Sequence, residues 1–155
     1  MEFTIKNTNI ISKLVEERVA KIPAVLNDAL VVERAKMIER TKRGMDIEGR
    51  RFKAYSKKNP GRDWRDVRKA NSKQIGYVDL TFDDDMLDPN GMSIDIRRNG
   101  SKFLATISFT DAKQARKAKG HQTGQLGLIK FFPRRFFGFS RPQRGAIASK
   151  LRDIR

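Results

Sequence analysis

The feature that most constrains the fold is a pair of alternating segments on either side of Asn99-Gly100. Apolar residues occupy every second position from Met92 to Ile96, and they alternate again from Lys102 to Phe109. A period of two is typical of a β-strand with one buried face, and Asn-Gly is the favoured two-residue turn of a hairpin. The sequence therefore predicts an antiparallel β-hairpin over about residues 91–110.

The turn also predicts the register of this hairpin. If Asn99-Gly100 forms the two-residue loop, one set of apolar side chains lies on a single face, and polar side chains fall mostly on the other. The predicted cross-strand pairs on the apolar face are Ile96 with Phe103, Ile94 with Ala105 and Met92 with Ile107.

Helical periodicity dominates the N-terminal third of the chain. After a short alternating segment at residues 2–6, which predicts a strand, apolar residues keep a helical spacing over residues 11–22 and again over residues 25–38. Pro23 is expected to break or kink the helix between these two runs, because it has no amide hydrogen to donate. Gly44 lies where the second helix would stop.

Two shorter helices are predicted after the hairpin. Asp111 is a candidate N-cap for a basic helix that Gly120 would end. Ser140 and Gln143 have the spacing of a capping box, and Pro142 lies in the first turn of the terminal helix, where its missing donor costs little.

Together these elements predict one α+β domain over residues 1–155. A chain of 155 residues is long enough for one core and too short for two. We expect N-terminal helices packed on a small antiparallel sheet that contains the hairpin, followed by a short C-terminal helix.

The charge of the chain is strongly positive and unevenly distributed. With 34 basic and 18 acidic residues, the formal net charge is +16. Two basic blocks, residues 34–73 and 113–155, flank an acidic one, residues 74–112. This asymmetry predicts a polyanion or an acidic protein surface as a neighbour, or contacts between copies of the chain.

The chemistry needed for catalysis is sparse. The chain has no cysteine and one histidine, which excludes disulfides and thiolate metal sites; without a G-x-S-x-G context or a second histidine, a catalytic triad or a zinc site is very hard to build. The lone His121 is typical of a hydrogen-bonding loop residue. Asp83, Asp84 and Asp85 are consecutive, so they point in different directions and do not converge on one metal ion. We expect no enzymatic activity and no cofactor; a metal-dependent nuclease is the remote alternative.

No membrane partner is expected either. No apolar run approaches the ~20 residues that a bilayer-spanning helix needs. The N-terminus also lacks the basic start and apolar middle of a signal peptide, so assembly in a cytosol is predicted.

Residues 45–76 are predicted to be a basic loop or insertion, and one hypothesis is that this segment is flexible before assembly and becomes ordered on docking. Glycines punctuate this segment, and aromatic residues are interleaved with Lys and Arg. Such a pattern fits nucleic-acid binding by phosphate contact and stacking, and it also fits a solvated loop. The candidate partner-facing or DNA-facing residues here are Arg50, Arg51, Lys57 and Lys58.

Residues 121–140 hold five of the ten phenylalanines. Placed after the hairpin and before a capped helix, this segment is expected to close the core, with alternate phenylalanines buried. Gly138 would let the chain turn into the helix, and Arg134 and Arg135 would be left for a neighbouring molecule.

Several motifs, in order, resemble the phage virion-morphogenesis family, whose members are also described as tail-completion or head-tail neck proteins. Residues 41–56 are similar to the family stretch "RT…G…D…G…F…YS". Met86-Leu87 matches its "ML", residues 121–124 its "HQ.G", and residues 135–140 its "RPFFGLS". The chain departs from the pattern where the family has Thr-Gly before Met-Leu and where it has proline after arginine. The motif residues that the resemblance marks as structural are Gly44, Gly49, His121, Gln122, Gly124, Phe136, Phe137 and Gly138.

The resemblance implies a structural virion protein of a tailed phage, assembled in the host cytoplasm. It would form a homo-oligomeric ring of roughly six or twelve copies at the head-tail neck. Its partners would be a portal or head-closure protein, a tail terminator or tail tube protein, and, non-specifically, the packaged DNA. The alternative prediction is a basic nucleic-acid-binding module without catalytic activity.

Overall fold

The computed structural model describes residues 8–54, 64–71, 75–78, 80, 85–130 and 132–154. In these residues the chain is α+β, as predicted. The strand expected at residues 2–6 lies outside them. The elements in chain order are helix α1 (Thr8–Lys42), helix α2 (Trp64–Ala70), the 3-10 turns η1 (Asp85–Leu87) and η2 (Pro89–Gly91), strands β1 (Met92–Asn99) and β2 (Lys102–Phe109), helix α3 (Ala112–Thr123), strands β3 (Gln125–Leu126) and β4 (Ile129–Lys130), and helix α4 (Arg141–Arg152).

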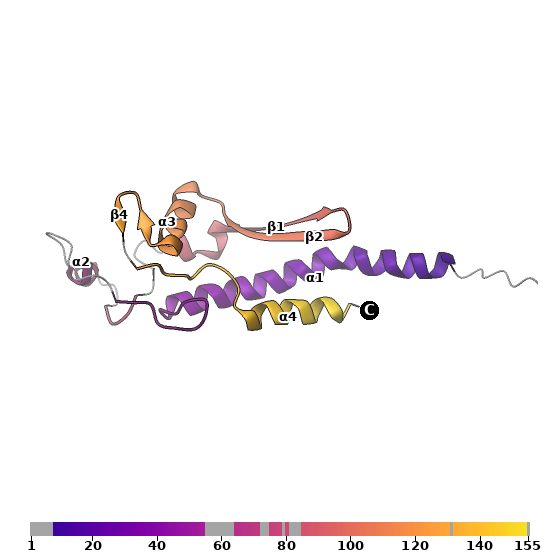
Figure 1. The fold of residues 1–155 in the computed structure, drawn as a ribbon, viewed down its shortest axis with the longest axis horizontal. Helices are drawn as coiled ribbons and strands as arrows, with labels where there is room; N and C mark the ends of the chain where they lie inside the picture. The colour runs from indigo at the N-terminus through magenta and orange to yellow at the C-terminus, as the bar shows by residue number, and fades with distance from the viewer. Residues whose placement is uncertain are drawn as a thin grey trace, which may run out of the picture.

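Helix α1 is the long axis of the molecule. Its 35 residues span about 52 Å at 1.5 Å per residue. The β1–β2 hairpin lies along one side of α1, and α4 lies along another (Figure 1). The N-terminal turns of α1 project beyond both of these neighbours (Figure 1). The other elements gather around its C-terminal end.

The predicted break at Pro23 is wrong, because α1 runs through this residue. A proline inside a helix removes one backbone hydrogen bond and costs about 3 kcal/mol. The apolar face nevertheless stays in phase across the proline, since half-buried Val19 and Ile22 continue into buried Leu26 and Leu30. Packing of one continuous face therefore offsets the lost bond, and a single helix replaces the predicted pair.

The predicted stop at Gly44 is confirmed. The Gly44 amide donates to the carbonyl of Thr41 at 2.9 Å, and the Met45 amide donates to the carbonyl of Arg40 at 3.1 Å. This pair of bonds is a Schellman motif, which requires a left-handed residue, and Gly44 has φ +77°. Gly44 also lies against Tyr77 and Val78, so this turn leaves no room for a side chain at Gly44.

The hairpin is confirmed, but its register is displaced by two residues. Asn99 pairs with Lys102, so Gly100-Ser101 forms the loop. Gly100 has φ +61°, whereas no positive φ is found at Asn99, as a loop at Asn99-Gly100 would require. Because side chains alternate with a period of two, this displacement leaves the same residues on the apolar face. The observed pairs on that face include Met92 with Phe109, Ile94 with Ile107 and Ile96 with Ala105.

The two later helices begin as predicted, and one ends elsewhere. The Asp111 side chain accepts a hydrogen bond from the Gln114 amide at 2.8 Å, and Ser140 and Gln143 form the capping box of α4. Gly120, however, lies inside α3, which continues to Thr123. The helix ends at Gly124, whose φ is +74°. A glycine inside a helix costs only ~1 kcal/mol, so the left-handed conformation, not the first glycine, decides where the helix ends.

The core lies at the C-terminal half of α1. It joins residues from α1, the segments that follow it, the hairpin, α3 and the aromatic segment. Its buried members are Met37, Ile38, Phe52, Val78, Leu80, Met86, Leu87, Met92, Ala118 and Phe136. The molecule is thus densely packed at one end, and α1 is only partly covered at the other.

Substitution of two glycines tests the turn that follows α1. An added Cβ at Gly44 would lie 2.6 Å from Tyr77 Cδ2 and 2.7 Å from the Val78 carbonyl oxygen, whereas at Gly49 it would meet nothing within 4 Å. Both glycines have φ +77°. Left-handed strain alone costs about 1–2 kcal/mol. We expect Gly44→Ala to lower the free energy of unfolding in urea by at least ~1 kcal/mol more than Gly49→Ala does. Equal losses would contradict the packing seen at Gly44.

Candidate functional site

The residues that carry the phage-family resemblance meet at the C-terminal end of α1. We call this region the motif junction; it consists of residues 41–52, 121–124 and 134–140. The Ile47 amide donates to the Arg135 carbonyl at 2.7 Å, and the Gln122 side-chain amide donates to the Phe137 carbonyl at 2.6 Å. Three segments far apart in sequence are therefore held together through backbone groups.

Arg40 connects the motif junction to α1 and α4. Its guanidinium donates to the Phe136 carbonyl at 2.8 Å and to the Gln143 side-chain oxygen at 2.9 Å. Burial lowers the pKa of Arg40 below its usual value, and the nearby carboxylates of Asp46 and Glu48 act in the opposite direction. The sequence analysis did not predict this role, although the position of Arg40 in the helical pattern indicates that its side chain is partly buried. It is seven residues after Glu33 and shares the buried face of α1, where a charged residue needs partners.

The aromatic segment is divided between core and surface. Phe136 is fully buried, and Phe137 packs its ring 5.0 Å from that of Phe109. Phe132 is 58% exposed, and the ammonium of Lys53 lies 3.9 Å from the centre of its ring. Phe131 lies outside the described residues. The segment therefore closes the core through Phe136 and Phe137 and leaves Phe132 at the surface.

The prediction that Arg134 is left for a neighbour is wrong. Arg134 is buried, and its amide donates to the His121 carbonyl at 2.7 Å. The Phe136 amide donates to the Arg134 carbonyl at 2.9 Å, so the chain makes a tight three-residue turn here, and the side chains of both Arg134 and Phe136 are buried. Arg135, between them, is exposed as expected.

The remaining glycines of the motif allow close turns. Gly49 closes a turn in which Asp46 accepts hydrogen bonds from two backbone amides, and Gly124 caps α3. Gly138 has φ +132°, and its amide points at the sulfur of Met37, 3.4 Å away. The motif residues that the structure describes thus shape the junction rather than form a chemical centre.

His121 lies in the last turn of α3 and not in a loop. Burial, together with the positive charges of Arg134 and Lys117, lowers the pKa of His121 to about 4. The imidazole is therefore neutral near pH 7.

Of the candidate partner-facing or DNA-facing residues Arg50, Arg51, Lys57 and Lys58, the structure describes the first two, and both are exposed. The Arg50 side chain forms an ion pair with Asp46 at 3.1 Å, and Arg51 is exposed beside a β-bridge to Met45. Lys57 and Lys58 lie outside the described residues. Residues 45–54 of the predicted loop form an ordered turn whose Phe52 is buried, and helix α2 lies within the same segment.

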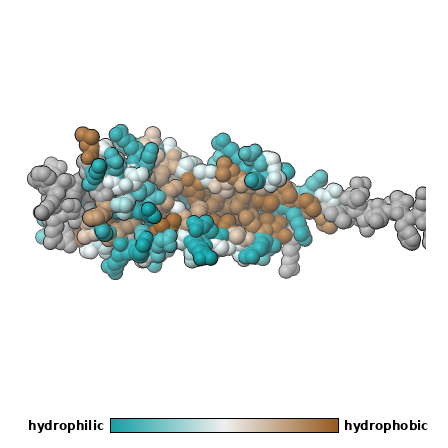
Figure 2. Space-filling view, in the orientation of Figure 1, coloured by the Kyte–Doolittle hydropathy of each residue, from teal (hydrophilic) through white to brown (hydrophobic). Residues whose placement is uncertain are grey.

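Large exposed apolar side chains lie on α1, at Leu104 of β2, and in the segments at the opposite end of the molecule. On α1, Leu14 and Val15 are each 54% exposed, and Val31 and Val32 are also exposed. Leu128, in the β3–β4 turn, is fully exposed. Figure 2 shows hydrophobic surface along the half of the molecule toward the N-terminal end of α1.

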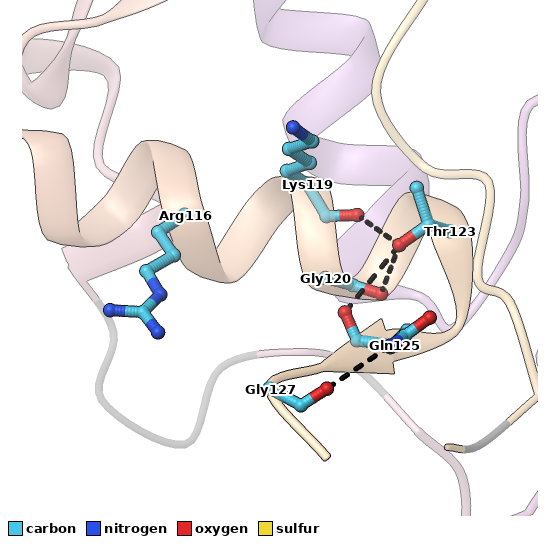
Figure 3. A pocket seen from close by; sticks show the side chains of 6 residues that line it. All are labelled: Arg116, Lys119, Gly120, Thr123, Gln125 and Gly127. Carbon is cyan, nitrogen blue, oxygen red and sulfur yellow. Dashed lines mark hydrogen bonds between the residues drawn. The ribbon is translucent and has the colours of Figure 1, made fainter. Parts of the chain in front are cut away.

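An open depression of about 410 Å³ lies beside the C-terminal half of α3 (Figure 3). Its lining residues are Arg116, Lys119, Gly120, Thr123, Gln125 and Gly127. They include two cations and no carboxylate, so they supply neither a general base nor metal ligands. Across the part of the chain that the structure describes, no group of three or more acidic or histidine side chains is placed to hold a metal ion.

Within the same described ranges, no helix is both long and apolar enough to cross a membrane. Comparison with known protein families, with curated proteins and with solved structures finds no match for this chain.

Replacing Arg40 by lysine tests its connection to the aromatic segment. Lysine keeps the charge, but its single ammonium cannot reproduce the bonds to Phe136 and Gln143, and such bonds contribute about 1.5–3 kcal/mol. We expect Arg40→Lys to lower the unfolding free energy by about 2 kcal/mol. Arg43→Lys is the matched control, because Arg43 forms an exposed ion pair with Glu39 and should change stability by less than ~1 kcal/mol. Similar losses in both variants would refute the connecting role.

His121 should make stability depend on pH. Its pKa is about 4 in the folded chain against an ordinary 6.5, so the unfolded state binds more protons between these values. Stability therefore falls as the pH drops from 6.5 to 4, by up to ~3 kcal/mol from this residue. We expect His121→Gln to lose less stability than the wild type over that range in parallel urea titrations. Carboxylates titrate in both proteins, so the difference between them isolates His121, and identical pH profiles would rule the effect out.

Proposed function

We propose that this chain is a structural virion protein of a tailed phage that forms a homo-oligomeric ring at the head-tail neck. Its partners there are the portal or head-closure protein on one side and the tail terminator or tail tube protein on the other. The order of the family-like motifs supports this assignment, and the motifs' structural role in the junction agrees with a protein that works by assembly.

The observation that carries the proposal is the distribution of apolar residues around α1. Leu26, Leu30 and Met37 point into the molecule and are buried. Val31 and Val32 lie on other sides of the same helix and are 41% and 42% exposed. Exposed valines beside a buried apolar face extend the apolar surface of the helix beyond the part that its own chain covers. Other subunits are the natural cover.

The projecting end of α1 supports the same conclusion. Val15 continues the face formed by Val19 and Ile22, and these residues are followed on that face by Leu26. The hairpin and α4 end before α1 does (Figure 1). The apolar face thus extends past the elements that bury it, and Val15 is 54% exposed there.

Charge favours contacts between copies. Residues 12–33 carry three basic and four acidic side chains, for a net charge of −1, in a chain whose total is +16. The uncovered part of α1 therefore lies in a segment that is close to neutral, in contrast to the two basic blocks of the chain. A second copy would place its basic surface against this portion without the repulsion that two basic surfaces would experience.

Native mass spectrometry and negative-stain imaging test the proposal. The protein would be studied alone at high concentration, and together with purified phage heads and tails that lack it. We expect rings, either free or formed on the tail or head platform, and restored joining of heads to tails. A protein that stays monomeric under all these conditions and joins no neck complex would contradict the proposal.

A charged variant of α1 tests the surface that carries the proposal. Val31→Glu/Val32→Glu should fold normally, because both residues are exposed, but it should fail to form rings. Ala146→Glu/Ser149→Glu, on the exposed side of α4, adds the same charge to another helix as the matched control and should still form rings. Normal ring formation by the α1 variant would exclude this helix face as the contact.

A further inference from the structure

Helix α3 carries a row of cations on its exposed side. Lys113, Arg116 and Lys119 are all exposed and follow one another at intervals of three residues, about 4.5 Å along the helix. No acidic residue occurs between Ala112 and Thr123. Lys130 adds a fourth cation: it is exposed and pairs across the β3–β4 ladder with Gln125, and cross-strand partners share a face. We call these four residues the α3 basic face.

Among the residues that the structure describes, these cations have no acidic partner, in contrast to several others on the surface. Arg43, Arg50 and Arg97 are each paired with a carboxylate of a nearby residue. Among the described residues, none of Lys113, Arg116 and Lys119 forms an ion pair. The N-cap Asp111 is engaged by the Gln114 amide. The positive charge of the α3 basic face is therefore available to an external anion.

The depression beside α3 borders the α3 basic face. Arg116 and Lys119 both line it, but their side chains extend away from one another (Figure 3). Two cations that diverge in this way do not enclose one small anion. They are suited to separate anionic groups on a polymer that passes over the depression.

The backbone oxygens of the depression are largely engaged within the protein. Thr123 Oγ1 lies 3.0 Å from the Lys119 carbonyl oxygen and 3.4 Å from that of Gly120, and the Gln125 side-chain amide donates to the Gly127 carbonyl at 3.1 Å (Figure 3). The C-terminal end of a helix carries a partial charge of about −0.5, which opposes anion binding. The four cations of the α3 basic face outweigh it.

We propose that the α3 basic face binds the phosphate backbone of a nucleic acid. A nucleic acid presents closely and regularly spaced negative charges along its length, which matches a row of unpaired cations better than the scattered carboxylates of a protein surface do. The proposal concerns a surface separate from the apolar sides of α1, and it stands whether or not the chain forms a ring.

Fluorescence anisotropy with a labelled DNA duplex of mixed sequence tests the proposal over a range of NaCl concentrations. Each phosphate contact contributes about −0.9 to the slope of log affinity against log salt. We expect Arg116→Gln/Lys119→Gln to make this slope shallower by about 2 units and to weaken binding similarly for unrelated sequences. The charge-preserving variant Arg116→Lys/Lys119→Arg should restore the wild-type slope.

Arg43→Gln/Arg97→Gln is the matched control, because it removes two positive charges that are already paired with carboxylates. It should leave the slope nearly unchanged. An equal effect in both double variants would show that only net charge matters, and this would overturn the proposal. It would also be overturned by an unchanged slope in the α3 variant, or by polyglutamate competing as well as unlabelled DNA does. Ring formation by the α3 variant, measured separately, distinguishes this result from a failure of the proposed assembly role.

Discussion

The arrangement of the core around the C-terminal half of α1 depends on the hydrogen bonds of the partly buried Arg40 guanidinium. It binds the Phe136 carbonyl and the Gln143 side chain together. The same Gln143 oxygen accepts the Ser140 amide at 3.0 Å in the capping box of α4. One arginine thus fixes the aromatic segment and the start of the last helix relative to α1. Because its donors sit in a fixed plane, it sets orientation as well as proximity.

The rest of the molecule divides into two regions with different physical character. At the C-terminal end of α1, buried apolar residues and backbone hydrogen bonds hold several segments in one arrangement. Toward the N-terminal end, α1 carries apolar residues that its own chain leaves exposed, among them Leu14 and Val32. The first region is a fixed framework, and the second offers exposed apolar side chains for contact with other molecules. The cations of α3 belong to the framework region but face outward, so an anion could be bound without disturbing the packing beneath them.

Local sequence signals predicted much of the fold, and tertiary context accounts for the errors. The hairpin alternation, the stop at Gly44 and the capping box at Ser140 depend on residues close together in sequence, and all three are confirmed. Pro23 and Gly120 are weak helix breakers when packing favours continuity, so both were misplaced as boundaries. The inward orientation of Arg134 and the bonds of Arg40 depend on partners about 13 to 103 residues away, which no local pattern reveals.

The register of the hairpin bears on how chains of this type can vary in length. Adding or removing one residue in each strand would place the side chains beyond that point on the opposite face of the hairpin. A change of two residues in each strand returns every apolar side chain to the face that packs on α1. Each such change would move the hairpin tip by about 7 Å along the helix. The length of α1 that remains uncovered could therefore be adjusted in discrete steps, with Met92 and the core beneath it left in place. Subunits with the same core could in this way leave different lengths of α1 uncovered.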